Sequence, residues 1–144
     1  MKEVNAKEAY EKMQNDPEYI YLDVRSIPEY EKGHATGAIN IPIMHFQPGM
    51  GMMPNEDFVK VVESNLPKNA KLVVGCQMGG RSARACEILT QLGYTDVSNI
   101  RGGFSGAMDH MGRMVEPGWS TLGLPVSTGG GDDASYGKLC EKTK

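Results

Sequence analysis

The segment VVGCQMGGRSARACEIL, residues 73–89, combines residue types that together favour nucleophilic chemistry at a cysteine. Cys76 directly follows an apolar run typical of a buried strand, and a helix-like stretch begins soon after it. Gly79 and Gly80 allow backbone conformations that turn successive N–H groups into one concavity. The positive N-terminal end of the following helix adds to the same field. This setting favours a reactive thiolate rather than a cysteine used only for packing.

Arg81 lies five positions after Cys76, and its planar guanidinium offers paired donors to an oxyanion. In open α/β sheets, ligands bind outside the carboxyl ends of the strands, which is where we expect Cys76. The other candidates for contact with a substrate belong to the same loop, and they are Gln77, Met78, Gly79, Gly80 and Ser82. A thiolate of this kind requires no metal and no organic cofactor.

The composition is that of an ordinary globular domain. The chain has 144 residues and a net charge of −3, which gives no reason to expect binding to nucleic acid or to an anionic membrane. No segment approaches the roughly 20 apolar residues of a membrane span. Three widely spaced cysteines do not suggest a disulfide framework, and the first residues lack the apolar stretch of a signal peptide. We therefore expect a protein with free thiols in the cytoplasm.

Strand-like and helix-like segments alternate around the cysteine loop, which predicts a parallel sheet with helices on both faces. We expect strands over 19–24, 39–41, 71–75 and 96–100, and helices over 6–14, 28–32, 55–66, 82–92 and 102–114. Asn5 and Asn55 are the expected caps of two of these helices. Beyond residue 127 the chain is rich in glycine and charge, so we expect one domain over 1–127 and a flexible tail over 128–144.

Four segments resemble the rhodanese family of sulfurtransferases. Residues 22–42, LDVRSIPEYEKGHATGAINIP, are similar to the family's N-terminal signature, and CQMGGRS at 76–82 is similar to its active-site loop. GYTDVSNIRGGFSGA at 93–107 and GWSTLGLPV at 118–126 resemble later segments of the family, in the same order. The resemblance covers roughly residues 4–126. It implies a small parallel α/β sheet of about five strands.

The resemblance also implies an activity. Cys76 would take a sulfane sulfur from thiosulfate or a related anion and become a persulfide. It would then pass the sulfur to cyanide, to a thiol or to an acceptor protein. The loop amides of residues 77–82 would cradle the persulfide, and Arg81 would bind the oxyanion of the donor.

Two other functions stay open at this point. One is a sulfur relay that docks a partner protein and turns over free thiosulfate poorly. The other is a phosphatase or arsenate reductase, since such enzymes share the rhodanese fold. Their loops have one more residue between cysteine and arginine, however. Here four residues, 77–80, intervene, which fits the smaller sulfur cargo better.

Several residues near the signature have both a functional and a structural interpretation. Asp23 and Arg25 either support the active-site floor and the donor, or form an ion pair that holds the fold. His34 is better explained as a residue that holds a turn than as a general base. Cys86 fits a small buried side chain, and Cys140 fits a surface thiol better than a thiol that resolves the persulfide.

Methionine is concentrated in two segments, 44–53 and 108–114, and the second is expected to place its methionines on one helical face. With His45 and His110 nearby, a copper(I) site is chemically conceivable, but flexible apolar side chains are the more usual role of such methionines. Both segments are additional to the family pattern. We expect them to border the pocket, which would favour a sulfur donor that is bulkier or less polar than thiosulfate.

Overall fold

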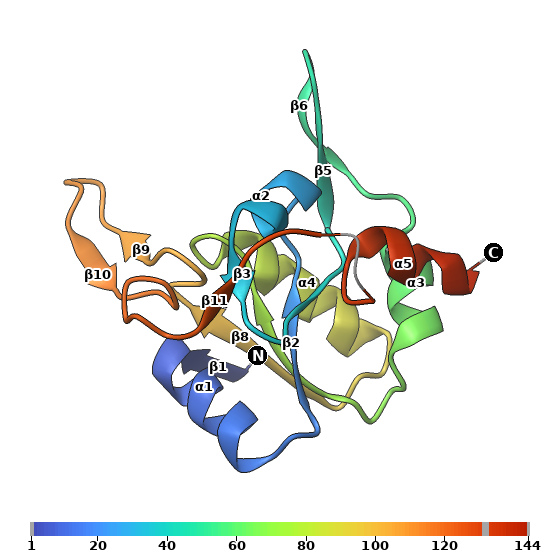
Figure 1. The fold of residues 1–144 in the computed structure, drawn as a ribbon, viewed down its shortest axis with the longest axis horizontal. Coiled ribbons are helices and arrows are strands. Elements are labelled where there is room, and N and C mark those ends of the chain that lie inside the picture. Colours follow the sequence, from blue (N-terminus) through green and yellow to red (C-terminus); the bar gives the residue numbers. More distant parts are fainter. Residues whose placement is uncertain (1, 131–132, 144) are drawn as a thin grey trace.

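The computed structural model describes residues 2–130 and 133–143, and a five-stranded parallel sheet lies at its centre (Figure 1). The strand order across the sheet is β1 (Lys2–Asn5), β8 (Asp96–Arg101), β7 (Lys71–Gly75), β2 (Tyr19–Asp23) and β4 (Ile39–Asn40). Every pairing within this sheet is parallel. The expected α/β fold with a small parallel sheet is therefore confirmed. Strand β1 was not predicted, because so short and polar a segment shows no clear period.

The helices are α1 (Ala6–Asn15), α2 (Ile27–Lys32), α3 (Phe58–Asn65), α4 (Gly80–Gln91) and α5 (Tyr136–Cys140), followed by a 3-10 turn, Glu141–Thr143. Helix α1 begins as predicted at Asn5, whose side chain accepts a hydrogen bond from the Glu8 amide at 2.8 Å. The Glu8 carboxylate in turn accepts from the Asn5 amide at 2.9 Å. This reciprocal pair is a capping box, and it satisfies two amides at the helix start.

The two faces of the sheet carry separate apolar clusters. Along β7, Leu72 and Val74 pack into the cluster beneath α3 and α4, whereas Val73 packs into the other cluster. The second cluster contains Trp119, whose ring meets that of Tyr21 edge to face at 5.3 Å. This alternation is what a strand buried on both faces requires. It fixes β7, and therefore the loop that follows it, from both sides.

The prediction of a helix over 102–114 is wrong. The segment forms a hairpin of β9 (Ala107–Met108) and β10 (Met114–Glu116), which projects from the body of the molecule (Figure 1). Glycines explain the error, since Gly106 and Gly112 adopt φ values of 98° and 80°, which no helix accommodates. Met108 and Met114 consequently face each other across the hairpin instead of lying along one helical face.

A second hairpin, β5 (Met44–Gln47) and β6 (Gly51–Pro54), projects elsewhere on the molecule (Figure 1). It contains the other methionine-rich segment. A short antiparallel pair, β3 (His34–Ala35) and β11 (Val126–Ser127), joins the signature region to the later part of the chain. In the residues that the structure describes, no helix is long and apolar enough to cross a membrane.

The helix start expected at Asn55 lies slightly later, because Asp57 is the N-cap of α3. The Asn55 side chain instead donates to the carbonyl of Pro42 at 2.8 Å and to the Tyr136 hydroxyl at 3.1 Å. Its own oxygen accepts from the Asp57 amide at 3.0 Å. Asn55 therefore ties the start of α3 to segments on either side of it.

The segment after residue 127, which we expected to be a flexible tail, contains a helix that was not predicted. Helix α5 packs against α3, and Tyr136 and Leu139 are buried in the first cluster. The Asn65 side chain on α3 donates to the Leu139 carbonyl at 3.0 Å. The sequence did not predict α5, because its two buried apolar residues lie in a short polar stretch and give too weak a helical period. The domain boundary at residue 127 itself stays a prediction.

Candidate active site

The cysteine loop lies where the sequence predicted it, between the carboxyl end of β7 and the start of α4. The Cys76 sulfur accepts a hydrogen bond from the Gly79 amide at 3.0 Å. Gly79 has a φ of 114°, so a residue with a side chain would be strained at this point. Cys76 is only 2% exposed, and its sulfur therefore lies within the loop and beneath the first turn of the helix.

Ser82 also faces the sulfur, with its hydroxyl 3.4 Å from the Cys76 Sγ. The same hydroxyl lies 2.6 Å from the Asn99 Oδ1 and 3.1 Å from the Gly79 carbonyl. The single hydroxyl hydrogen of Ser82 therefore has three acceptors within reach, and the shortest contact is the one to the Asn99 Oδ1. Sequence reasoning missed Asn99, although an amide inside the apolar strand DVSNI was a usable signal.

The segment after β8 holds the peptide groups of the loop. The Phe104 amide donates to the Cys76 carbonyl at 2.8 Å, and the Ser105 amide donates to the Gln77 carbonyl at 3.0 Å. Gly103 lies so close that a Cβ would collide with both of these carbonyl oxygens. The loop is therefore fixed by one segment that is distant from it in the sequence.

Arg81, in the first turn of α4, forms a bidentate pair with Glu29 of α2 at 2.7 and 2.8 Å. Burial raises the pKa of the Glu29 carboxyl, but the hydrogen bonds from Arg81 and Ser26 and the Arg81 charge outweigh it and lower the pKa to about 2. Glu29 engages two of the five guanidinium N–H groups. Three N–H donors of Arg81 are therefore not engaged by Glu29.

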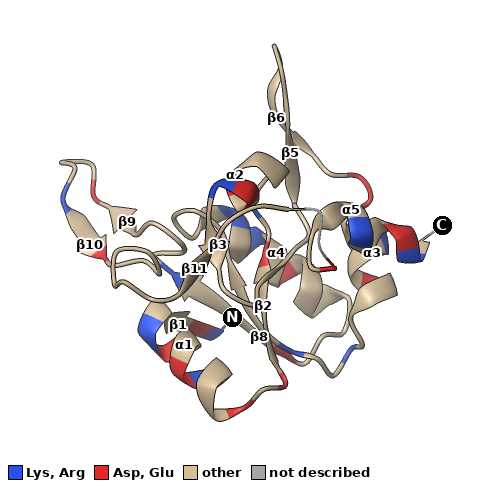
Figure 2. Ribbon diagram, viewed as in Figure 1, with Lys and Arg blue, Asp and Glu red and all other residues tan. Residues whose placement is uncertain are grey.

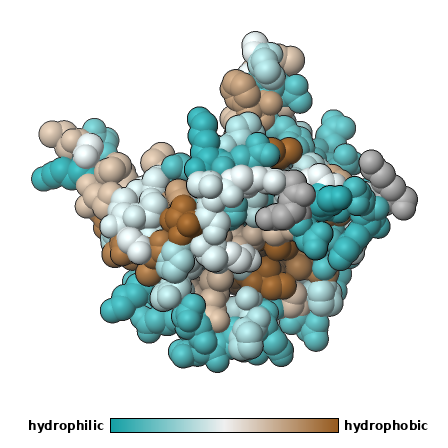
Figure 3. Space-filling model, viewed as in Figure 1, coloured by the Kyte–Doolittle hydropathy of each residue, from teal (hydrophilic) through white to brown (hydrophobic). Residues whose placement is uncertain are grey.

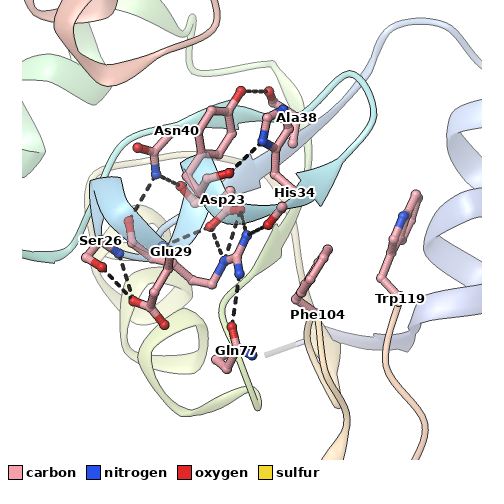
Figure 4. A network of polar contacts seen from close by, with 12 residues as sticks. Asp23, Ser26, Glu29, His34, Ala38, Asn40, Gln77, Phe104 and Trp119 are labelled. Carbon is pink, nitrogen blue, oxygen red and sulfur yellow. Dashed lines mark hydrogen bonds and ion pairs between the residues drawn. The ribbon is translucent and has the colours of Figure 1, made fainter. Parts of the chain in front are cut away.

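Asp23 and Arg25 form the ion pair that one of their two interpretations predicted (Figure 4). The Arg25 Nη2 donates to Asp23 at 2.8 Å and to the Gly33 carbonyl at 2.7 Å. Its Nη1 donates to the Gln77 side chain at 2.9 Å, and its guanidinium lies 4.4 Å from the Phe104 ring centre. Both charged side chains are buried. The pair therefore supports the loop from beneath.

The remaining predicted residues of the loop are Gln77, Met78 and Gly80. Gln77 borders a cavity of about 430 Å³ together with Arg25 and Phe104. Met78 is 57% exposed, and Gly80 is the first residue of α4. Of the sequence-predicted residues, the structure thus places Gly79 and Ser82 against the Cys76 sulfur, and it joins Gln77 to Arg25. Their roles as catalytic and binding residues stay predictions.

The other histidines and cysteines occupy structural positions. His34 stacks on the Tyr30 ring and donates from Nδ1 to the Tyr30 carbonyl at 2.7 Å, as expected of a residue that holds a turn. Cys86 is fully buried, and desolvation raises the pKa of its thiol to about 12. Cys140 lies on α5, which covers α3 rather than the cysteine loop (Figure 1).

The structure does not bring together the residues of the copper hypothesis. His45 lies on β5 with its ring 5.4 Å from that of Tyr136, while His110 lies in the turn of the other hairpin. Figure 1 shows the two hairpins projecting in different directions. Among the residues that the structure describes, no group of three or more His, Cys, Asp or Glu side chains is arranged to hold a metal ion.

Comparison with known proteins matches residues 5–110 to the family model of the rhodanese-like domain. The chain is 41% identical over 106 residues to thiosulfate sulfurtransferase 16, chloroplastic, of Arabidopsis thaliana, covering 74% of the chain and 78% of that relative. It is 44% identical over 89 residues to protein HIGH ARSENIC CONTENT 1, mitochondrial, of the same plant, covering 62% of the chain and 52% of the relative. The chain thus spans only about half the length of some relatives.

These relatives overturn the expected cytoplasmic location. One of them is named as a chloroplastic protein and the other as a mitochondrial one. The inference from cysteine content was too narrow, because free thiols indicate a reducing environment and not one particular compartment. The described cysteines are indeed free.

The fold agrees with solved structures as well. The crystal structure of Rv0390 from M. tuberculosis superposes with a TM-score of 0.74 at 24% identity, covering 90% of this chain and 98% of that one. At that identity the likeness concerns the fold alone. Taken with the family match over most of the chain and the loop at the end of β7, it leads to one conclusion: the chain belongs to the rhodanese family.

Proposed function

We propose that this protein is a sulfurtransferase that carries sulfane sulfur as a persulfide on Cys76. Membership of the rhodanese family and relatives named thiosulfate sulfurtransferases support a role in sulfur transfer. The single observation that carries the finer proposal is the hydrogen bond from the Gly79 amide to the Cys76 sulfur. This N–H is a preorganised donor to the sulfur that attacks in the first half-reaction and is regenerated in the second.

In the first half-reaction, the Cys76 thiolate attacks the outer sulfur of thiosulfate. The sulfur–sulfur bond of the donor breaks, and sulfite leaves with the bonding electron pair. The N–H groups of Arg81 that Glu29 does not engage bind the departing oxyanion. The Gly79 amide and the Ser82 hydroxyl face the sulfur that receives the new bond.

In the second half-reaction, an acceptor attacks the outer sulfur of the persulfide and regenerates the thiolate. Cyanide leaves as thiocyanate, and a thiol leaves as a new persulfide. The two halves share one covalent intermediate, so the kinetics are ping-pong. Since Cys76 is 2% exposed, the enclosed loop suits a cargo as small as one sulfur atom.

The test combines thiocyanate production from thiosulfate and cyanide with intact-mass spectra before and after the donor is added. We expect the wild type to gain one sulfur atom and to turn over, and we expect Cys76→Ser to do neither. Cys140→Ser is the matched control, because it removes a thiol on α5 while leaving the loop intact. If the Cys76→Ser protein still gains sulfur, or the wild type never does, the proposal is wrong.

The same protein preparation also tests two alternative functions. Sulfur loading without steady-state turnover would identify a relay that awaits a partner protein. Hydrolysis of an aryl phosphate, or reduction of arsenate with a thiol as the electron source, would identify a phosphatase or an arsenate reductase. The arsenate assay is included because one relative at 44% identity is named for arsenic content.

A further inference from the structure

A carboxylate of the protein already occupies part of the guanidinium that we expect to bind the donor. The Glu29 oxygens accept hydrogen bonds from Nη1 and Nη2 of Arg81 at 2.7 and 2.8 Å. The same carboxylate accepts from the amide and the hydroxyl of Ser26 at 3.1 and 2.8 Å. Glu29 is therefore fixed at the start of α2, and it remains beside Arg81 when a second anion approaches.

The two charges of this pair nearly cancel for a ligand that approaches from water. Both side chains are partly exposed, so an anion from solvent can reach the pair. Figure 2 shows basic and acidic residues next to each other on α2, and Figure 3 shows a mostly hydrophilic surface over this helix. An anion at Arg81 therefore also lies close to the Glu29 charge, whose repulsion offsets much of the attraction.

Glu29 borders two cavities near the cysteine loop. It shares one, of about 440 Å³, with Arg81, and the other, of about 430 Å³, with Gln77 and Arg25. Lys32 lines both cavities. Two of these three cations are already paired with carboxylates, because Arg25 belongs to the buried ion pair and Arg81 is bound to Glu29. An anion in either cavity thus meets a weaker positive field than the number of basic side chains suggests.

Arg81 also lies within electrostatic reach of the Cys76 sulfur. Hydrogen bonding to Glu29 raises the pKa of Arg81 against the opposing effect of burial, and a negative charge on Cys76 raises it further. Glu29 stays ionised at neutral pH, because its own pKa is lowered to about 2. Arg81 therefore acts on an anion that reacts at Cys76, and the Glu29 charge acts on Arg81 throughout the cycle.

The first half-reaction is complete only when its anionic product has left. Sulfite that stays beside the persulfide can attack the outer sulfur with its own electron pair. That attack breaks the bond from the outer sulfur to the Cys76 sulfur, regenerates the thiolate and forms thiosulfate again. An arginine that held donor and product equally tightly would lower KM without raising kcat. A weaker hold on anions therefore favours the forward reaction.

We propose that Glu29 is a positioning residue that acts through Arg81, limiting the strength with which Arg81 holds anions so that sulfite leaves the persulfide form of the enzyme. This inference rests on the proposed sulfurtransferase function and concerns the end of its first half-reaction. The N–H groups of Arg81 that Glu29 does not engage orient the donor. Glu29 itself undergoes no chemical change.

The first experiment is Glu29→Gln, which removes the charge but keeps a residue type that suits the capping box of α2. With cyanide as the acceptor, we expect KM for thiosulfate to fall about three- to tenfold, since one like charge near a dianion is removed, while kcat does not rise. Sulfite competes with cyanide for the persulfide form in a ping-pong cycle, and its Ki should fall by a similar factor. Sulfate, an unreactive dianion, measures anion binding by competition against thiosulfate.

Three further variants test whether the charge of Glu29 is responsible. Glu29→Ala is a second neutral variant, and its KM and Ki values should change in the same direction as those of Glu29→Gln. Glu29→Asp keeps the charge and should restore values close to those of the wild type. The matched control is Glu63→Gln on α3, which breaks the ion pair with Lys68 at 2.7 Å. Urea unfolding establishes that each variant is folded.

The outcomes separate this inference from the proposed function. If thiosulfate adds sulfur to Cys76 but both neutral variants leave KM and the two Ki values unchanged, the inference is wrong and the sulfurtransferase proposal stands. A rise in KM for Glu29→Gln would mean that Glu29 holds Arg81 in its binding geometry, which also overturns the inference. A fall that Glu63→Gln or Glu29→Asp reproduces overturns it as well. If the wild type gains no sulfur, the proposed function itself fails.

Discussion

Two arginines flank the cysteine loop, each paired with a carboxylate, and they differ in their access to water. The side chains of Arg25 and Asp23 are 3% and 2% exposed, whereas those of Arg81 and Glu29 are 22% and 31% exposed. Arg25 directs its donors to Asp23, to the Gly33 carbonyl and to Gln77. Arg25 is thus committed to holding the loop in place, whereas Arg81 keeps N–H groups that Glu29 does not engage.

The largest expected effect is on stability and concerns the buried pair. In Arg25→Ala the Asp23 carboxylate stays buried without its cation, which costs about 3–5 kcal/mol of unfolding free energy. Urea unfolding measures this loss of unfolding free energy. Arg113→Ala is the control, because Arg113 forms an exposed pair with Asp109, and such pairs contribute about 1 kcal/mol or less. Equal losses in the two variants would contradict the structural role of Arg25.

The next effect is on catalysis and concerns the partly exposed pair of Arg81 and Glu29. Arg81→Ala removes charged hydrogen bonds to the donor, each of which contributes about 1.5–3 kcal/mol, so KM for thiosulfate should rise roughly 10- to 100-fold. Steady-state kinetics with cyanide as the acceptor measure this KM in the two proteins. The unfolding free energy should fall far less than in Arg25→Ala. An unchanged KM would mean that Arg81 serves only to bind Glu29.

A smaller effect on the unfolding free energy is expected at acid pH. The folded-state pKa of Glu29 is lowered to about 2, below the ordinary value of 4.5, so the pair's contribution is present above pH 4.5 and is lost as pH falls toward 2. Glu29→Gln abolishes that dependence. Because the pair is partly exposed, we expect a difference of about 1 kcal/mol in acid-dependent stability between the two proteins. Urea titrations near pH 6 and pH 3 compare them, and parallel pH profiles would refute the assignment.

The smallest effect refines the environment of Arg25. Phe104→Leu keeps an apolar side chain but removes the ring that faces the guanidinium at 4.4 Å. We expect a loss of about 0.5–1 kcal/mol in unfolding free energy, the range for such cation–π contacts. A loss as large as that of Arg25→Ala would show that the ring, and not the ion pair, fixes Arg25.

Local patterns predicted the fold well. The apolar run at 71–75 and the glycine turn before α4 depend on neighbours in the sequence, and both were predicted correctly. The hairpin at 107–116 was missed because its methionine spacing also suits a helix, and only the left-handed glycines decide against one. Helix α5 was missed because its burial depends on α3.

The position of the cysteine loop was predictable from the sequence, but the residues that support the loop were not. Cys76 and its loop are adjacent in the sequence, so their chemistry could be inferred from spacing. Glu29 lies 52 residues from Arg81, and Asn99 lies 17 residues from Ser82. Pairings of this kind arise only from the sheet order. Sequence reasoning therefore assigned Arg81 to the donor alone and did not foresee its carboxylate partner.

The clamp formed by the Phe104 and Ser105 amides has a consequence for synthesis on the ribosome. These amides hold the carbonyls of Cys76 and Gln77, yet they emerge after the loop does. The first strand, β1, pairs within the sheet with β8 alone, so it too waits for residues 96–101. The nascent chain thus exposes Cys76 before it can enclose it. Long-range closure of this kind is slow, and the cysteine is open to oxidation for that interval.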